Sequence, residues 1–189
     1  MPLEGENVIL REEKEEDLDL LVELRNNLDT QAWSQRLPPD YTLPMYRQRF
    51  LERKFSFFRT DGRFIITHKT NGEFIGSISY SDFQPRFSAT IGIVIKKEFW
   101  GTGVAFDAQE ILLKFLFLEL GVRVVRIWTQ SGNTRAVKLA QKSGFRISGK
   151  IRNAIFLRGE FFDNLVVDLL REEYFTLHPE LKDNLSLLD

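Results

Sequence analysis

The chain of 189 residues has no cysteine and only two histidines, His68 and His178. Without cysteine the protein has no disulfide, no thiolate nucleophile and no thiolate metal ligand. The two histidines are far apart in the sequence, and neither has a second ligand at the spacing of a metal site. These absences disfavour a metal site and a metal-dependent enzyme.

The chain also lacks an excess of either charge and any long apolar run. Lys and Arg number 26 against 27 Asp and Glu, so no basic field is available to hold a nucleic-acid backbone. The longest apolar run, residues 111–122, contains Lys114 and Glu119 and is too short to cross a bilayer. The first residues are acidic, whereas a signal peptide starts basic and continues apolar. We expect a cytoplasmic protein that binds neither nucleic acid nor a membrane.

Hydrophobic periodicity predicts the order of the secondary structure. The length suits one domain over residues 1–189, and no Pro/Gly/Ser-rich linker divides it. Alternating apolar residues predict strands at 7–12, 63–69, 73–83, 89–97 and 122–129, and then two strands within 146–174 joined by a turn at Arg158-Gly159. Helical spacing predicts helices at 14–28, 45–55, 104–120 and 133–144. The predicted order is strand-rich at first, then a strand, a turn, a helix, a strand and a helix, and finally a hairpin.

The stretch "EFWGTGVAFDAQ", residues 98–109, puts Gly101 and Gly103 at the predicted start of a helix. Glycines there let backbone N–H groups come close to an anion, and the helix dipole favours negative charge. A tight turn from strand to helix explains the same two glycines, and the strict dinucleotide fingerprint is absent. Taken alone, this fragment favours the plain turn.

Further motifs follow in a fixed order after this turn. A long helix and a strand lead to Asn133, which opens a helix ending in "KSGF", and the closing hairpin carries "GKIR" and "RGEFFD". From Ile91 to Tyr174 this series resembles the GNAT superfamily of acetyl-CoA-dependent N-acetyltransferases, in particular the branch of ribosomal-protein N-terminal (RimJ/RimL-like) acetyltransferases. The resemblance implies an α+β fold of the mixed αβα kind, with a central, mostly antiparallel twisted sheet flanked by helices. In this sheet the strands at 89–97 and 122–129 splay apart.

The resemblance also implies acetyl-CoA as co-substrate and a place for it. The family's phosphate loop, Gln or Arg, two residues, Gly, one residue, then Gly or Ala, falls on Trp100, Gly101, Thr102, Gly103, Val104 and Ala105. Trp100 departs from the pattern, but it removes no backbone donor, so we expect binding to survive. The backbone N–H groups that stabilise the oxyanion of the reacting thioester are implied at Ile93, Val94 and Ile95.

For catalysis, the resemblance points to Asn133, whose amide would reach the pantetheine arm or the sulfur of the cofactor. A plain helix N-cap explains Asn133 equally well, and the two roles are compatible. The positions where relatives carry a Ser or a Tyr as proton donor hold Ala136 and Ala140. Thr134, Ser131 or water remain as substitutes, and nothing in the sequence selects among them.

The general base and the acceptor pocket are less well marked. Candidate bases are Tyr80, Ser81, Asp82, Asp29 and Asp40, and a base acting through ordered water leaves no mark in a sequence. In this architecture the acceptor cleft lies between the segment around the first two helices and the closing hairpin. We expect the acceptor to contact Arg25, Trp33, Tyr80 and Asp82, with Tyr41 and Phe83 as further lining residues. Trp33 is equally well explained as a core anchor.

These observations predict an acetyltransferase that transfers the acetyl group of acetyl-CoA to a primary amine by direct attack in a ternary complex. The amine belongs to a protein N-terminus or to a small molecule such as an amino sugar, a polyamine or an antibiotic. The alternative is a catalytically weak CoA-binding or scaffold protein, because Ala136 and Ala140 donate no proton. The 17 phenylalanines suit a homodimer interface or a hydrophobic acceptor.

Overall fold

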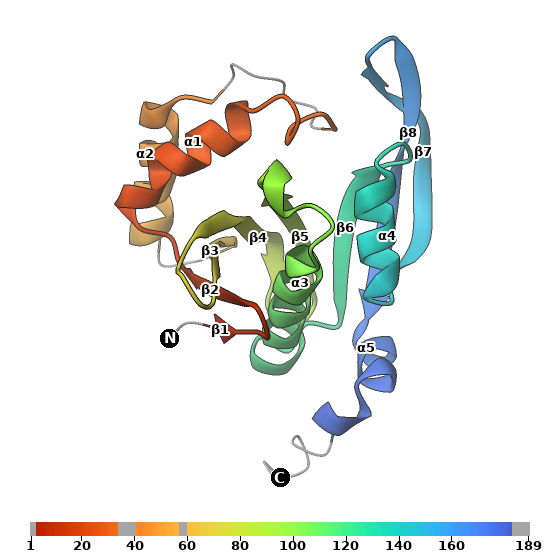
Figure 1. Cartoon of the computed structure of the whole chain (residues 1–189). Helices are drawn as coiled ribbons and strands as arrows, with labels where there is room; N and C mark the ends of the chain where they lie inside the picture. The colour runs from red at the N-terminus through yellow and green to blue at the C-terminus, as the bar shows by residue number, and fades with distance from the viewer. Residues whose placement is uncertain (1–2, 34–40, 57–59, 183–189) are drawn as a thin grey trace.

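The computed structural model describes residues 3–33, 41–56 and 60–182, and these form an eight-stranded sheet flanked by helices (Figure 1). The strands are β1 (Leu3–Glu4), β2 (Val8–Glu12), β3 (Gly62–His68), β4 (Phe74–Gln84), β5 (Ser88–Ile95), β6 (Val124–Gln130), β7 (Arg146–Leu157) and β8 (Glu160–Leu170). The helices are α1 (Leu18–Asn26), α2 (Leu43–Phe55), α3 (Val104–Lys114), α4 (Thr134–Lys142) and α5 (Arg171–Leu177).

The strands lie in the order β1-β2-β3-β4-β5-β6-β8-β7, and every neighbouring pair is antiparallel except β5 and β6. This arrangement confirms the predicted α+β fold and its mostly antiparallel sheet. The predicted hairpin at residues 63–83 is β3 and β4, and Gly72 closes its turn with an N–H that donates to the oxygen of His68 at 2.9 Å.

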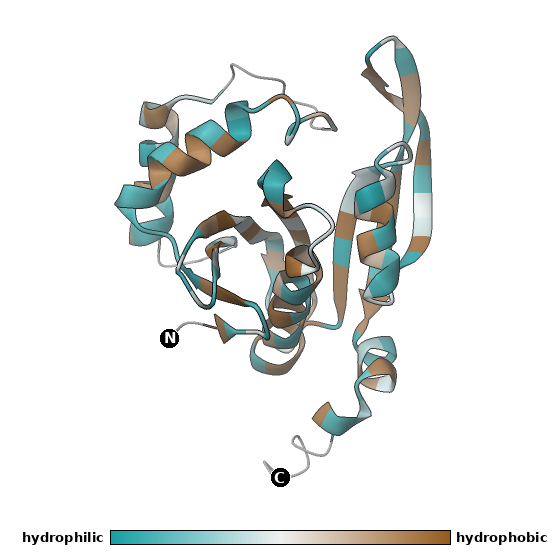
Figure 2. Cartoon of the chain, in the orientation of Figure 1, coloured by the Kyte–Doolittle hydropathy of each residue, from teal (hydrophilic) through white to brown (hydrophobic). Residues whose placement is uncertain are grey.

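Alternation along the strands supplies a core to each face of the sheet. Ile65 packs into a cluster with α1 and α2, whereas its neighbour Ile66 packs into the larger cluster with α3. On β5 the same alternation puts Val94 against the first cluster and Ile93 against the second. Figure 2 shows the apolar residues concentrated where the helices face the sheet. The sheet therefore separates an α1–α2 layer from a layer that contains α3.

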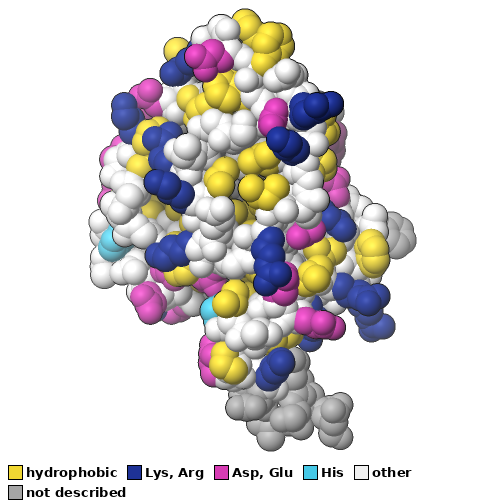
Figure 3. All heavy atoms as spheres, turned by 90° about the vertical axis from the view of Figure 1, so that its right-hand side faces the viewer, with side chains coloured by type: hydrophobic (Ala, Val, Ile, Leu, Met, Phe, Trp, Pro, Cys, Tyr) yellow, Lys and Arg dark blue, Asp and Glu magenta, His cyan; other side chains and the backbone are white. Residues whose placement is uncertain are grey.

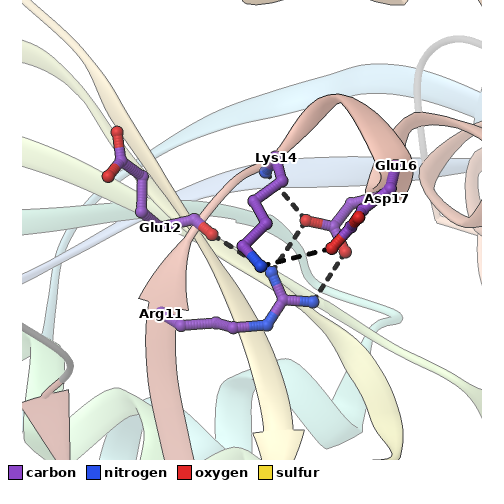
Figure 4. Close-up of polar contacts among 5 residues, drawn as sticks. All are labelled: Arg11, Glu12, Lys14, Glu16 and Asp17. Carbon is purple, nitrogen blue, oxygen red and sulfur yellow. Dashed lines mark hydrogen bonds and ion pairs between the residues drawn. The ribbon is translucent and has the colours of Figure 1, made fainter.

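The corner between β2 and α1 is fixed by a buried acid (Figure 4). Asp17 is 2% exposed, and its carboxylate accepts bonds from both terminal nitrogens of Arg11, at 2.6 and 2.8 Å. It also accepts the N–H of Lys14 at 2.8 Å. Burial raises the pKa of Asp17, but the hydrogen bonds from Arg11 and Lys14 outweigh burial and leave the pKa below its usual value.

The first predicted helix is too long at its C-terminus. The prediction placed Leu28 on the apolar face of helix 14–28, but α1 ends at Asn26 and Leu28 is 63% exposed. The Asn27 side chain accepts the N–H groups of Asp29 and Thr30, and the hydroxyl of Thr30 donates to the oxygen of Leu24. These local bonds offer the backbone an alternative to the helix and end it.

The predicted helix 104–120 is confirmed in extent, because α3 continues as a π-helical segment, Phe115–Glu119, and Gly121 follows it with a φ of 63°. The end of the closing hairpin needs correction. The prediction ran the closing hairpin to residue 174, whereas β8 ends at Leu170 and α5 follows. Glu173 accepts the N–H of Leu170 and so caps α5, and Tyr174 is buried against Phe117. Capping and packing therefore make residues Arg171–Leu177 a helix, although they directly follow strand β8.

Several large apolar side chains remain exposed on the last three strands. Figure 3 looks onto the side of the molecule formed by β7, β8 and α4, where apolar side chains alternate with Lys and Arg. The exposed apolar residues on β6, β7 and β8 are Trp128, Ile147, Ile151, Phe156, Phe161 and Leu170. The homodimer interface expected from the phenylalanines stays a prediction. In the described ranges no helix is long and apolar enough to cross a membrane.

Candidate active site

The centre of the site is the place where β5 and β6 separate. Their parallel pairing covers only Ser88 to Thr90 of β5, although β5 continues to Ile95. The opposite edge of β5 stays paired with β4 as far as Ile95. Figure 1 shows the two strands diverging toward their C-terminal ends. The splay that the resemblance implied is therefore present in the fold.

The backbone of β5 directs specific donors into this gap. The N–H of Lys96 donates to Ile75 of β4 at 2.9 Å. Because successive residues of a strand point to opposite edges, the N–H groups of Ile93 and Ile95 face the unpaired side. The N–H of Val94 faces β4 instead. Of the three residues expected to present an N–H, two have it directed into the gap.

The start of α3 lies beside the gap and has an open backbone. Gly101 and Gly103 have φ values of 79° and 91°, a region that favours glycine. A Cβ added to either glycine meets no atom of the described chain within 4 Å. Gly103 is the N-cap of α3 and has no side chain to cap it, so the first N–H groups of the helix are available to a ligand.

The side chain of Asp107 fixes this end of α3 to the first strands. Its carboxylate accepts the N–H groups of Glu6, Asn7 and Val8 at 3.2, 2.7 and 3.1 Å. Three charge-assisted bonds from consecutive residues hold the first turn of α3 against the β1–β2 loop. The position of the glycine loop therefore depends on residues about a hundred positions earlier in the chain.

Asn133 stands between β6 and α4, as predicted, and acts as an N-cap. Its Oδ1 accepts the N–H of Ala136 at 3.3 Å, and in the described part of the chain its Nδ2 donates to no acceptor. Ala140 is buried in the core. The Oδ1 of Asn133 thus caps α4, and its Nδ2 is available as a donor.

Trp33 reaches the same region from the α1–α2 side. Its ring packs edge to face on Phe162 of β8, with centroids 5.0 Å apart. A Cβ at Gly132 would overlap the Trp33 ring, so Trp33 lies directly against the residue before Asn133. A pocket of about 260 Å³ opens here, lined by Ala32, Trp33, Leu157, Arg158, Glu160 and Phe162.

The other expected acceptor residues lie elsewhere. The lining of this pocket does not include Arg25, Tyr80 or Asp82. Arg25 donates to Gln31 at 3.4 Å and lies 6.0 Å from the centre of the Tyr41 ring. Tyr41 itself is buried between α1 and α2.

Tyr80 and Asp82 both belong to β4. Tyr80 pairs with Ile91 of β5, and its ring packs against Phe83. Asp82 is exposed and has a φ of 49°, at the irregularity where β4 and β5 shift register. None of these contacts brings Tyr80 or Asp82 next to Trp33.

Of the candidate bases, Asp29 is engaged in an ion pair. Its carboxylate lies 2.8 Å from the Nζ of Lys97, which follows β5. The hydrogen bond from Lys97 holds the pKa of Asp29 below its usual value, which makes it a weaker base. Asp40 lies outside the described residues. The pair connects the segment after α1 to the end of the splayed strand.

Comparisons with known proteins agree with this geometry. The family described as "Acetyltransferase (GNAT) domain" matches residues 7–146. The chain belongs to the GNAT acetyltransferase family. It is 27% identical over 176 residues, 92% of this chain and 96% of the relative, to the SPbeta prophage-derived uncharacterized N-acetyltransferase YokL of Bacillus subtilis. It is 31% identical over 105 residues, 55% of this chain and 57% of the relative, to the putative ribosomal N-acetyltransferase YdaF of the same organism.

A solved relative shows the same fold with ligands. Spermidine N-acetyltransferase from Vibrio cholerae, crystallised with CoA and spermine, superposes with a TM-score of 0.81 at 21% identity, covering 89% of this chain and 98% of that one. The similarity to YdaF is consistent with the branch that the sequence resembles. This acetyltransferase therefore uses acetyl-CoA, the co-substrate of its family.

The residues of this GNAT site fit acetyl-CoA chemically. When bound, the co-substrate supplies an acetyl thioester. The inward N–H groups of Ile93 and Ile95 are donors for a carbonyl, and the open backbone at Gly101 and Gly103 is suited to a pyrophosphate. The acetyltransferase thus presents donors of the right kind along one edge of β5 and at the start of α3.

Sequence reasoning missed four residues of this region. Gly132 and Phe162 contact Trp33, Asp107 fixes α3, and Arg135 stacks on Trp100. An acidic residue in the first turn of a predicted helix was the available signal for Asp107. Gly132 and Phe162 gave none, because their role depends on segments that meet only in the folded chain.

Proposed function

We propose that this acetyltransferase transfers an acetyl group from acetyl-CoA to a primary amine, that of a protein N-terminus or of a small molecule, by direct attack in a ternary complex. The observation that carries the proposal is the unpaired edge of β5 from Ile91 to Ile95 beside the glycine loop at Gly101–Gly103. This edge places backbone donors where a thioester carbonyl develops negative charge during attack by an amine.

The cofactor side of the reaction has named residues in this proposal. The N–H groups of Ile93 and Ile95 bind the carbonyl and the pantetheine arm, with Val94 holding the strand in place through the α1–α2 cluster. The loop from Trp100 through Gly101, Thr102 and Gly103 to the first helical residues Val104 and Ala105 binds the pyrophosphate. Here the N–H groups act together with the helix dipole.

Asn133 is the proposed catalytic side chain. Its Oδ1 caps α4, which leaves Nδ2 as a donor for the sulfur as the C–S bond breaks and the sulfur becomes a thiolate. Ala136 and Ala140 carry no hydroxyl, so the proton that the thiolate finally takes comes from water or from Ser131 or Thr134. A thiol with a pKa of about 8.5 makes a fair leaving group, so a dedicated acid is not essential.

Direct attack agrees with the residues available. The chain has no cysteine to carry the acetyl group between two half-reactions. The acceptor must first lose a proton from its ammonium form, and Asp29 is a poor base for this because it is paired with Lys97. Water and the other candidate bases, Tyr80, Ser81, Asp82 and Asp40, remain as proton acceptors in this proposal. The free amine then attacks the thioester carbon and forms the C–N bond, and the nitrogen gives up a proton to water. The C–S bond breaks, and the CoA thiolate leaves and takes up a proton to become the thiol.

The acceptor enters on the side of Trp33 in this proposal. The pocket beside Trp33 combines apolar walls, Leu157 and Phe162, with one carboxylate, Glu160, and one cation, Arg158. A carboxylate suits an ammonium group, and apolar walls suit the carbon chain that carries it. Arg25, Tyr80 and Asp82 lie outside this pocket and remain proposed acceptor contacts of the wider entrance.

A catalytically weak CoA-binding protein is the second candidate, favoured by Ala136 and Ala140. Release of free CoA from acetyl-CoA, measured with spermidine, amino sugars and peptides bearing free N-termini, separates the two. Turnover with at least one amine supports an active acetyltransferase, and the amine that reacts identifies the class of acceptor. Tight acetyl-CoA binding with no turnover on any amine supports the second candidate.

A further inference from the structure

Trp100 and Arg135 form a pair at the junction of the glycine loop and α4. The central carbon of the Arg135 guanidinium lies 3.7 Å from the centre of the Trp100 ring. The indole Nε1 donates to the oxygen of Ile95 at 3.0 Å, which fixes the ring beside the splayed end of β5. A planar guanidinium at this distance stacks on the indole face, so the ring sets its position.

Arg135 is otherwise unengaged in the part of the chain that the structure describes. No carboxylate of the described residues forms an ion pair with it, and none of its N–H groups donates to a protein acceptor there. The charge of Arg135 contributes to the lowered pKa of Asp29, but the carboxylate of Asp29 is paired with Lys97. An exposed arginine held flat on an indole therefore keeps its donors free around the edge of the plane.

We propose that Trp100 positions Arg135 as the cation that binds the pyrophosphate of coenzyme A. The inference rests on the proposed function, because it requires the pyrophosphate to lie on the loop at Gly101–Gly103, directly after Trp100. Where the family pattern has Gln or Arg at position 100, this chain has an indole that holds an arginine from the next helix. The polar contact is kept, but its side chain comes from α4.

The position of Arg135 also explains why a tryptophan suits the loop. Backbone N–H groups alone satisfy some of the pyrophosphate oxygens, and a guanidinium adds two parallel N–H donors and a full charge. Lys142, at the other end of α4, has its Nζ 3.9 Å from the centre of the Phe106 ring of α3. Two cations of α4 thus lie over aromatic rings, Arg135 over Trp100 before α3 and Lys142 over Phe106 in the first turn of α3.

The test is the dissociation constant for CoA and for dephospho-CoA, measured by calorimetry on the full chain. Arg135→Ala is expected to weaken both ligands equally, by about tenfold or more, the value of one charge-assisted contact. Arg146→Ala is the control, since it removes the same charge from a side chain that is 75% exposed and forms an ion pair with Glu173. It should leave both constants unchanged.

The positioning role of Trp100 is tested by a double-mutant cycle. Trp100→Leu should also weaken the binding of CoA. The Trp100→Leu/Arg135→Ala double variant should bind CoA no more weakly than Arg135→Ala alone. Fully additive losses overturn the positioning role. Thermal unfolding of each variant confirms that folded protein is compared. Arg135→Lys keeps the charge without the planar stack, and its affinity for CoA should lie between those of wild type and Arg135→Ala.

Two other outcomes overturn the assignment. If Arg135→Ala binds CoA as wild type does, Arg135 does not bind the cofactor. If its loss of affinity disappears with dephospho-CoA, Arg135 binds the 3′-phosphate and not the pyrophosphate. Failure of the wild-type chain to bind CoA is a different result, because it contradicts the proposed function and not the role of Arg135.

Discussion

The cofactor side and the acceptor side of this site are built in different ways. The proposed cofactor side consists of the edge of β5 and the start of α3, where the donors are backbone N–H groups of two neighbouring segments. The proposed acceptor side is a pocket walled by side chains from distant segments, among them Trp33 and Phe162, with Trp33 lying against the backbone of Gly132; these segments meet only when the chain folds. A backbone site tolerates sequence change, whereas a side-chain site changes its specificity with each substitution.

This difference explains how members of one family act on different amines. In the proposed site the splayed strand and the glycine turn hold one co-substrate, because any residue other than proline supplies an N–H. The walls of the proposed acceptor pocket are side chains, which a substitution changes directly. The structure of this chain therefore predicts that substitutions separate the two sides, cofactor binding changing with one set and acceptor use with the other.

The largest effect is expected from Gly103→Val. The branched side chain fills the space that the phosphates need, and acetyl-CoA should bind about a hundredfold more weakly or worse. The positive φ adds roughly 1–3 kcal/mol of strain to the folded state. Gly72→Val is the matched control, since Gly72 also has a positive φ and open space around its Cβ, in the β3–β4 turn. Calorimetry and thermal unfolding should show a similar loss of stability in both and a loss of binding only in Gly103→Val.

A smaller effect is expected from Asn133→Asp. The aspartate keeps an oxygen to cap α4 but lacks the Nδ2 donor, so kcat should fall about tenfold, the value of one hydrogen bond formed as the thiolate develops. The melting temperature and the acetyl-CoA dissociation constant should change little. Asn133→Ala additionally removes the cap, at a cost of about 0.5–2 kcal/mol. Equal kcat in wild type and Asn133→Asp would reduce Asn133 to a cap.

On the acceptor side, Trp33→Ala should raise the KM for the amine about fivefold, because the half-buried ring forms one wall of the pocket. The dissociation constant of acetyl-CoA should stay unchanged. Trp128→Ala removes an equally large side chain from the exposed face of β6 and serves as the control. Weakened acetyl-CoA binding in Trp33→Ala, with the KM unaltered, would contradict the separation of the two sides.

The smallest effect on acetyl transfer is expected from Asp17→Asn, because Asp17 belongs to the corner between β2 and α1 and to neither the proposed cofactor side nor the proposed acceptor side. The lowered pKa of Asp17 means that its carboxylate stabilises the fold above its unfolded pKa of about 3.8, and this stability is lost as the pH falls through the folded value. The variant should lose about 1–3 kcal/mol of stability at neutral pH. Its unfolding free energy should fall less steeply than that of wild type as the pH drops below about 4. Parallel acid profiles for the two proteins would show that Asp17 carries no such linkage.

Much of the fold was predictable because it follows local pattern. The hairpin at Asn71-Gly72, the Asn133 cap and Gly121 at a helix end are each set by a few neighbouring residues. The errors came where contacts distant in sequence decide, as in α5, whose Tyr174 packs on Phe117. Leu28 was misplaced for a local reason, the side-chain bonds of Asn27, which hydrophobic spacing does not report.

The candidate site divides in the same way. The glycine turn and the splayed strand were located from motifs, and the structure has both features at the predicted residues. The contact between Trp33 and Gly132 was not predictable, since nothing near either residue indicates the other. The same holds for Arg135 on Trp100, because a stacked pair formed by a loop residue and a residue of a later helix has no spacing to recognise.

Residue-resolved amide hydrogen exchange with and without acetyl-CoA tests most directly whether the backbone of β5 and the start of α3 hold the cofactor. We expect acetyl-CoA alone to slow exchange at Ile93, Ile95 and the first residues of α3, while the N–H of Lys96, already bonded to Ile75, changes little. Trp33 and Gly132 should respond only when a reactive amine is added with CoA. Unchanged exchange at Ile93 and Ile95 in protein saturated with acetyl-CoA would contradict a backbone-held cofactor on this edge of the sheet.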